Sequence, residues 1–338
     1  MTRPSSLADL ATIFDSQSIS GTRNRIINGA MDIAQRATTA TGAYTSTYTY
    51  VSLDRWAVFS PNSSTTLSRS TEVPAGFRNS LRIQRPSGNT GTSVLLVGQA
   101  IESVNVYDLS SQSVTLSFWA RAGANFSAGS SLVTFQVVTG TAADQGIGLV
   151  DTFTGRAVPI NQNLNLTTTW TRYTLVGTFG AGVQEAVFQF QWFPIGTAGA
   201  DDSVYITGVQ LEAGPFATPF ERRSFGQELA LCQRYYQRSN AGAANGFSLN
   251  GGDGLGFSHP TSNFRGGAKF PVTMRGTPTL TIFDDAGNSG RVSLFTGSWL
   301  SNQTIGVGPV ATATGFYLGH NIANSIETQY AYVASAEL

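Results

Sequence analysis

The sequence predicts an all-β protein in which an antiparallel β-sandwich is followed by a smaller β domain. Charged residues make up only 12% of the 338 residues, and glycine contributes 37 of them. Such a composition suits pleated strands joined by many turns. Residues 114–119 (VTLSFW) and 186–192 (AVFQFQW) alternate with the two-residue period of a half-buried strand. No long helical pattern lies between the strands, so a doubly wound α/β fold is not expected.

Residues 1–23 are expected to be an arm outside the sandwich. Ser6-Leu-Ala-Asp9 matches a capping box, and Leu7, Leu10 and Phe14 then share one helical stripe. A helix this short is marginal alone in water. Two interpretations stay open: a terminus packed on its own domain or frayed, or a peptide that becomes ordered when it docks on a partner.

Residues 24–222 carry the pattern of the sandwich, with turn residues between short runs, as in 85–88 (RPSG). Besides the two alternating strands, strands are expected at 81–84, 93–97, 132–138, 171–179 and 203–211. On the strand at 186–192, one face is aromatic and the other carries amides: Phe188, Phe190 and Trp192 against Gln189 and Gln191.

Residues 223–240 are expected to form a helix-containing joint. Pro215 and Pro219 mark the exit from the last sandwich strand, and Ser224-Phe-Gly-Gln227 is a capping box for a helix from about Phe225. Within that helix, Cys232 is expected to be a buried small hydrophobe. Residues 241–338 form the smaller C-terminal β domain, with strands expected at 269–273, 279–283, 291–295, 315–318 and 326–333, and Tyr235 and Tyr236 are expected to begin a strand just before it.

Composition also excludes several classes of protein. The formal net charge is zero and Lys269 is the only lysine, so no basic field exists to attract nucleic acid. Cys232 is the only cysteine, which excludes an intrachain disulfide and a cysteine-based zinc site. No stretch approaches the ~20 apolar residues of a membrane span, and the first residues lack the apolar core of a signal peptide. We therefore expect that the protein is made in the cytosol and does not insert into a membrane.

Several motifs resemble a family of tailed-phage virion proteins. They are residues 24–36 (NRIINGAMDIAQR), 53–56 (LDRW), 210–221 (QLEAGPFATPFE), 228–236 (ELALCQRYY), 270–278 (FPVTMRGTP) and 336–338 (AEL). Residues 117–120 (SFWA) and 169–175 (TWTRYTL) are similar to carbohydrate-binding jelly rolls of the galactose-binding-like kind. The resemblance implies a tail-fibre-type appendage with an antiparallel jelly-roll sandwich, a C-terminal β domain and a homotrimeric state.

Residues for catalysis and for metal binding are sparse. Only His259 and His320 could serve a Ser-His-acid site, and no Gly-x-Ser-x-Gly elbow is present. We expect a non-enzymatic protein without a cofactor, although acids from distant segments could still converge as in a glycosidase. Galactose-binding-like jelly rolls often hold a structural calcium ion, for which the resemblance offers three candidate ligands: Asp32, Asp201 and Glu212.

Aromatic side chains are the better ligand candidates, because sugar rings stack on exposed tyrosine and tryptophan. Candidate glycan contacts are Tyr44, Tyr48, Trp119, Trp299, Tyr317 and His320. The alternative for each is a place in the core or at a protein interface. Trp56 and Trp170 lie in the family-like motifs and are expected in the core.

The sequence thus indicates a virion appendage that contributes to adsorption on a host-surface glycan. Leu7, Leu10 and Phe14 of the arm would attach it to other virion proteins. Such a protein would be made in the host cytoplasm and released by lysis. Two alternatives stay open: a head fibre, capsid decoration or tail adaptor without a receptor, and a polysaccharide-degrading tail enzyme.

Overall fold

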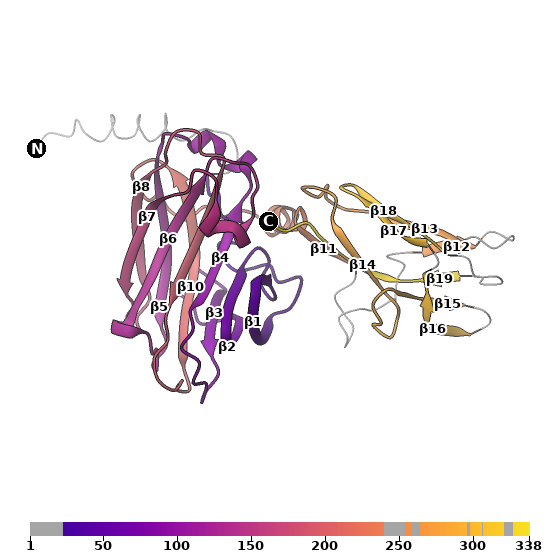
Figure 1. Cartoon of the computed structure of the whole chain (residues 1–338), viewed down its shortest axis with the longest axis horizontal. Helices are drawn as coiled ribbons and strands as arrows, with labels where there is room; N and C mark the ends of the chain where they lie inside the picture. The colour runs from indigo at the N-terminus through magenta and orange to yellow at the C-terminus, as the bar shows by residue number, and fades with distance from the viewer. Residues whose placement is uncertain (1–22, 240–254, 259–263, 296–297, 306, 321–326) are drawn as a thin grey trace, which may run out of the picture. The chain divides into compact units, whose positions relative to one another are not determined.

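The computed structural model describes residues 23–239, 255–258, 264–295, 298–305, 307–320 and 327–338 (Figure 1). The expected arm, with Leu7, Leu10 and Phe14, lies outside the described residues except for Arg23. The described chain divides into two compact units. One runs to Phe225 and also includes Leu338, and the other runs from Gly226 to Glu337.

The first unit is an antiparallel jelly-roll sandwich, which confirms the predicted fold class. Its strands are β1 (Thr39–Tyr50), β2 (Ala57–Ser70), β3 (Ser80–Arg85), β4 (Leu95–Ile101), β5 (Ser113–Ala122), β6 (Leu132–Gly140), β7 (Ala157–Asn165), β8 (Thr171–Thr178), β9 (Glu185–Trp192) and β10 (Asp202–Ala213). They pair in the order β7-β6-β9-β4-β2-β3-β10-β5-β8, and β1 pairs with β2.

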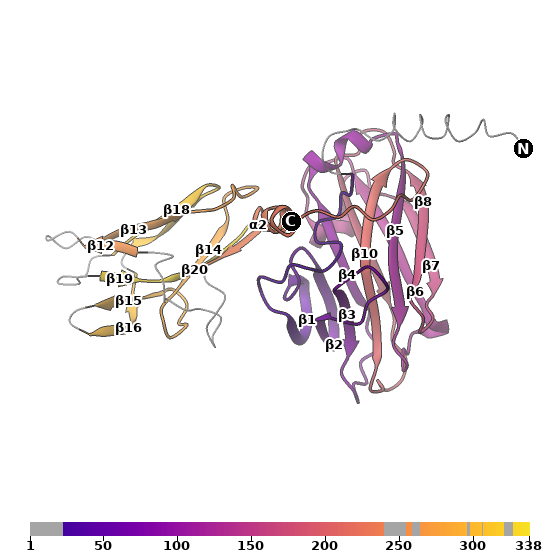
Figure 2. The ribbon, with the colours of Figure 1, turned by 180° about the vertical axis from the view of Figure 1, so that it is seen from behind.

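The long strand β2 links the two layers of the sandwich. Its first residues, 57–59, pair with β4, and its last residues, 66–70, pair with β3. One layer therefore contains β7-β6-β9-β4, and the other contains β3-β10-β5-β8. Figures 1 and 2 show this unit from opposite sides.

Aromatic side chains from both layers fill the space between them. The ring of Phe118 on β5 stacks on that of Phe135 on β6 at 4.4 Å, and Phe135 stacks on Phe190 at 5.5 Å. Trp56 is fully buried and meets Phe188 edge-on at 6.0 Å. The predicted inward faces of β5 and β9, and the predicted core position of Trp56, are confirmed.

A smaller apolar cluster covers part of the outer face of the β6-β9-β4 layer. It contains Ala100, Val138 and Val187 from the strands together with Ile147 and Val150 of the 3₁₀ helix η4 (Ile147–Thr152). Tyr48 and Tyr50 of β1 pack against this cluster. The outer face of this layer is therefore apolar where the cluster lies.

The family-like motifs fold against each other in the first unit. The side-chain oxygen of Asn24 accepts hydrogen bonds from the backbone amides of Ile26 (2.9 Å) and Leu211 (3.1 Å), while its amide nitrogen donates to the Val209 carbonyl (3.0 Å). The Glu221 carboxylate accepts from the backbone amides of Arg23 (3.1 Å) and Asn24 (2.7 Å). We call these contacts, and those of the next paragraph, the latch.

The chain after β10 turns back and binds the side chains of that same strand. Gln210 accepts a hydrogen bond from the backbone amide of Glu221 at 2.7 Å. Glu212 accepts from the amide and the hydroxyl of Thr218 at 2.9 and 2.5 Å. Buried Gln210 and Glu212 thus satisfy the polar groups of the returning segment, which gives the pattern QLEAGPFATPFE an architectural role.

The second unit is also built mainly of strands. Its elements are α2 (Phe225–Gln233), β11 (Tyr236–Arg238), β12 (Leu255–Ser258), β13 (Phe264–Lys269), β14 (Thr279–Phe283), β15 (Arg291–Phe295), β16 (Trp299–Thr304), β17 (Val307–Thr312), β18 (Gly315–His320), β19 (Glu327–Gln329) and β20 (Ala331–Ser335). The sheets run β11-β20-β14 and β16-β15-β19-β12-β13-β18-β17. Their shared core includes Phe270, Phe316, Leu318 and Tyr332.

The predicted helix at the joint, the buried Cys232 and the strand starting at Tyr236 are confirmed. Two predicted strands were wrong in detail, and β1 was not predicted. Residues 44–50 belong to β1, and their threonine and tyrosine residues suit a strand. The strand expected at 269–273 lies earlier, as β13, and Pro271 follows its end. The run at 326–333 is split at Tyr330 into β19 and β20, which belong to different sheets.

Candidate functional site

A group of uncharged polar side chains lies on the outer face of the β7-β6-β9 layer, beside the apolar cluster. Strand register sets two rows on its outer face. Asn161, Gln136 and Gln189 stand opposite one another in the first row, and Asn163, Thr134 and Gln191 do so in the second. Opposed residues of antiparallel strands share a face. We call these six side chains the amide face.

Hydrogen bonds join the first row into a directional chain. The Tyr48 hydroxyl donates to Gln189 Oε1 (3.3 Å), Gln189 Nε2 donates to Gln136 Oε1 (2.9 Å), and Gln136 Nε2 donates to Asn161 Oδ1 (3.0 Å). In the second row the Thr134 hydroxyl donates to Asn163 Oδ1 at 2.7 Å. The hydrogen-bonded first row runs from buried Gln189 to exposed Asn161, so its last amide faces solvent.

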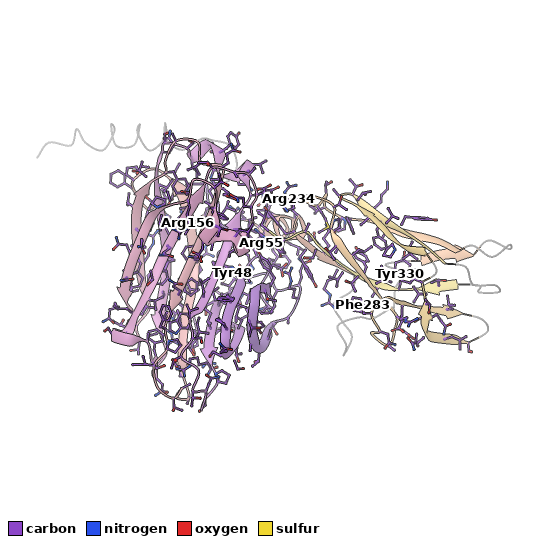
Figure 3. The ribbon with its side chains drawn as sticks, viewed as in Figure 1. Tyr48, Arg55, Arg156, Arg234, Phe283 and Tyr330 are labelled. Atoms are coloured by element: carbon purple, nitrogen blue, oxygen red, sulfur yellow. The ribbon has the colours of Figure 1, made fainter. Side chains whose placement is uncertain are left out.

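Tyr48 lies at the buried end of this hydrogen-bonded row (Figure 3). Its ring stacks on Phe59 of β2, with centroids 5.7 Å apart. Burial, and secondarily the negative charge of Asp151, raise the pKa of the Tyr48 hydroxyl. The hydroxyl therefore stays protonated at neutral pH and acts as a donor to Gln189. An aromatic pair and a row of amides thus adjoin on one face.

The structure separates Tyr44 from Tyr48, although both belong to β1. Tyr44 stands opposite Ser60 and packs against the main core, and burial raises the pKa of its hydroxyl. The register of β1 shifts between Tyr44 and Thr49, and Tyr48 and Tyr50 pack against the outer apolar cluster instead. Only Tyr48 of the two joins the amide face.

Trp119 lies on the other layer, on its outer face. It stands opposite Thr207 on β10 and Arg172 on β8, and it is half-buried. Trp170, expected in the core, is half-buried instead. It directly precedes β8, and the Arg121 guanidinium lies 5.8 Å from the centre of its ring.

Cation–π contacts fill that outer face around Tyr205. The Arg121 guanidinium lies 3.9 Å from the centre of the Tyr205 ring, and Arg82 lies 5.4 Å from the same ring. Tyr205 is only 4% exposed. Trp119 and Trp170 therefore lie on a face already filled by its own side chains.

The three calcium candidates lie apart, each with protein partners. Asp32 accepts from Asn79 (2.7 Å), Asp201 from Arg82 (2.8 Å), and Glu212 belongs to the latch. In the part of the chain that the structure describes, no group of three or more acidic, histidine or cysteine side chains could hold a metal ion. The same part contains no helix long and apolar enough to cross a membrane.

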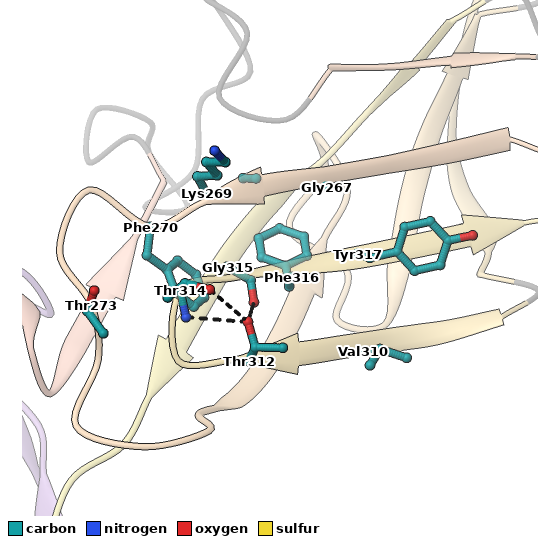
Figure 4. Close-up of a pocket in the computed structure, with 11 residues that line it drawn as sticks. Gly267, Lys269, Phe270, Thr273, Val310, Thr312, Thr314, Gly315, Phe316 and Tyr317 are labelled. Carbon is teal, nitrogen blue, oxygen red and sulfur yellow. Dashed lines mark hydrogen bonds between the residues drawn. The ribbon is translucent and has the colours of Figure 1, made fainter.

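The candidates of the second unit are only partly described. Tyr317 is 41% exposed and lines a groove of about 760 Å³ on the β13-β18-β17 sheet (Figure 4). The side chains of Trp299 and His320 lie outside the described residues, as does all of His259.

Sequence reasoning had not selected the amide face as a site. The alternation in residues 186–192 predicts that Gln189 and Gln191 lie on the polar face of their strand, so that alternation is a usable signal. Gln136 and Asn161 become neighbours only through the pairing of β6 with β7 and with β9. A similar alternation in residues 132–138 (LVTFQVV) places Gln136 opposite the buried apolar set.

No protein-family model matches the chain, and the search of curated proteins finds no matching relative. Solved structures similar to it include the enzymatically active domain of bacteriophage CBA120 tailspike protein 4, with 16% identity and a TM-score of 0.35 over 57% of this chain and 22% of that one. A CBM4 structure is 18% identical, with a TM-score of 0.33, over 55% of this chain and 98% of that one.

A further similar structure is the family 11 carbohydrate-binding module of a cellulosomal cellulase of Clostridium thermocellum. It is 8% identical, with a TM-score of 0.30, over 53% of this chain and 99% of that one. The chain thus spans about a fifth of the tailspike domain's length. Likeness at these low identities and TM-scores bears on neither ligand nor partner.

Proposed function

We propose that the jelly roll binds an uncharged glycan through the amide face, as part of a tail-fibre-type virion appendage without enzymatic activity. The hydrogen-bonded row from Tyr48 to Asn161 is the observation that carries the glycan part. The resemblance of residues 24–36 and 210–236 to phage virion proteins supports the appendage part.

The chemistry of the amide face matches sugar hydroxyls. Each hydroxyl can donate and accept, and so can each carboxamide, through its nitrogen and its oxygen. Thr134, Gln136, Asn161, Asn163, Gln189 and Gln191 carry no charge, so a neutral ligand meets no unpaired ion. Because the amides already orient one another, little side-chain entropy is lost when a ligand binds.

The aromatic pair supplies the apolar component of such a site. The half-buried rings of Tyr48 and Phe59 lie beside the polar rows, where they can contact the C–H face of a sugar ring. Phe59 stands opposite Leu96, which in turn stands opposite Gln191. The glycan is expected to lie across the strands, from Phe59 toward β7.

Binding to neutral polysaccharides tests the proposal, with affinity electrophoresis of the intact chain as the assay. Asn161→Ala and Gln136→Ala should each weaken binding by roughly tenfold, the effect of one lost polar contact. Gln84→Ala on the opposite layer, where the amide donates to the Ala200 carbonyl (2.9 Å), is the matched control and should bind normally. Equal binding by all three variants, or no binding by the parent chain, would refute the glycan site.

Separate measurements test the rest of the proposal. An electron-microscopy map of the particle should place the chain in a tail fibre as a homotrimer attached through residues 1–23. A position in the head, collar or adaptor would instead favour a head fibre, capsid decoration or tail adaptor that binds no receptor. Release of reducing ends from host polysaccharide by the purified chain would favour a degrading enzyme.

A further inference from the structure

We propose a second ligand site in the C-terminal unit, specific for a carboxylate-bearing sugar residue of an acidic polysaccharide. It is the groove on the β13-β18-β17 sheet, and its lining includes Lys269 and Tyr317 (Figure 4). The proposal extends the glycan-binding role to a separate unit, which would bind an anionic rather than an uncharged glycan. It does not depend on the amide face.

Strand register explains why a hollow exists there. Lys269, Gly315 and Thr312 stand opposite one another in one row, and Gly267, Tyr317 and Val310 do so in the next. All six positions share one face of the sheet. Glycine occupies one position in each row, so side chains surround a floor of bare backbone.

Both glycines are imposed by the packing of the sheet. A Cβ atom on Gly267 would lie 2.2 Å from the Phe316 carbonyl oxygen, and one on Gly315 would lie 2.5 Å from that of Ala268. The hollow is therefore a fixed feature of the fold. Its volume of about 760 Å³ falls within the ~300–1,000 Å³ usual for ligand sites.

The walls of the groove combine one cation with apolar surface. Tyr317 and Val310 are 41% and 60% exposed, so both have apolar surface free for a ligand. The Thr312 and Thr314 hydroxyls lie 3.2 Å apart at one end. Phe270 and Phe316 pack beneath the groove, with ring centroids 6.0 Å apart.

Lys269 determines the charge of the ligand. It is exposed, it is the only lysine of the chain, and none of the described lining residues is acidic. A groove lined by an exposed ammonium group and an exposed phenol ring fits a ligand with one anionic group and one apolar face. A hexuronate meets both needs, because its carboxylate lies at the edge of a ring whose face carries C–H groups.

Polygalacturonate and its fully methyl-esterified form are the probes, because they differ only in the carboxylate. Isothermal titration calorimetry of the full chain should show that it binds the acid polymer. The ester should bind on the order of tenfold more weakly. Binding of the acid polymer should also weaken as salt is raised, because the ion pair is exposed. Equal affinity for the two polymers, or no binding of the acid, would overturn the proposal.

Variants assign the binding to the groove. Lys269→Gln and Tyr317→Ala should each lower the affinity for polygalacturonate by about tenfold. Arg291→Gln is the matched control: it removes one positive charge from the same sheet, on β15, and should change the affinity less than twofold. Wild-type affinity in the first two variants would overturn the proposal.

Chemical protection gives a readout that does not depend on a variant. Because the chain has one lysine, amine acetylation followed by mass spectrometry reports Lys269 directly. Bound polygalacturonate should slow its acetylation, and an unchanged rate would count against the site. The variants Asn161→Ala and Gln136→Ala should leave polygalacturonate binding unchanged, so failure at the amide face and failure at this groove are distinguishable.

Discussion

Arg85 and Asp202 form an ion pair across β3 and β10, with Nη1 3.0 Å from Oδ2 and both side chains withdrawn from solvent. The Ser127 hydroxyl donates to Asp202 Oδ2 at 2.6 Å, and Arg85 also donates to the carbonyls of Asn89 and Gly196. The pair thus ties two loops to the end of the sandwich.

Asp202→Ala should lower the free energy of unfolding of the first unit by about 3–5 kcal/mol, because it leaves the Arg85 charge buried and unpaired. Tryptophan fluorescence during urea unfolding measures this, since four of the five tryptophans lie in that unit. Asp108→Ala removes the exposed pair with Arg25 (2.6 Å) and should cost only about 0–1 kcal/mol. Similar losses of unfolding free energy in the two variants would contradict a stronger contribution from the buried pair.

Glu185 gives a pH dependence of predictable sign. Burial first, and the neighbouring Asp144 charge less strongly, raise its pKa despite a hydrogen bond from the Gln145 amide. A raised pKa means that the stabilising contribution is complete below the ordinary glutamate pKa of about 4.3 and is lost as pH rises through the folded-state value. Glu185→Gln should therefore gain stability relative to the parent chain as pH rises across this window.

Asp201→Asn is the opposite-sign control for that experiment. Burial acts to raise the Asp201 pKa, but hydrogen bonds from Arg82, Ala124, Ser203 and Tyr205 outweigh it and the pKa is lowered. Its contribution is present above the ordinary aspartate pKa of about 3.9 and is lost as pH falls. Thermal unfolding from pH 3 to 8 should show the two variants diverging in opposite directions, and parallel curves would refute both assignments.

Gly208 occupies a β-bulge of β10 with a φ of +62°. A Cβ atom there would lie 2.5 Å from Phe77 Cζ and 3.2 Å from Trp119 Cδ1. Gly208→Ala should cost about 1–3 kcal/mol of unfolding free energy through strain and displaced rings. Gly180→Ala, where nothing lies within 4 Å, should be close to neutral in the same urea titration.

Glu221→Ala should loosen the latch by leaving the backbone amides of Arg23 and Asn24 without their acceptor, at a cost of about 1–3 kcal/mol. Hydrogen exchange at these two amides should quicken, while the core amides of β9 keep their protection. Glu72→Ala is the control, because that carboxylate is 68% exposed and pairs with the Arg121 side chain at 3.4 Å. Unchanged exchange at Arg23 and Asn24 would show that the latch has little strength.

Much of the fold was predictable because alternation is a local property. The strands β5 and β9 have one fully apolar face, and their predicted bounds were correct to within a few residues. In contrast, β2 and β7 were not predicted. Their threonine, serine, asparagine and proline residues resemble loop composition, and β7 has polar residues along its exposed edge.

The candidate site was predictable only one residue at a time. An exposed tyrosine is a recognisable candidate for sugar stacking, but the partner of Tyr48, Gln189, is 141 positions away in the sequence. Nothing local shows that β6 lies between β7 and β9, which is what aligns Gln136 with Asn161 and Gln189. The hollow beside Tyr317 likewise depends on glycines from two different strands facing each other across β13 and β18.

The latch has a mechanical consequence. It holds Arg23 and Asn24 against Glu221, so the chain enters and leaves the sandwich at the same place. A pulling force between the segment before residue 23 and the segment after residue 223 would be borne by these few hydrogen bonds. The strands of the jelly roll other than β10 lie outside that path, so a ligand-binding face on β7-β6-β9 would keep its shape while the chain is under tension.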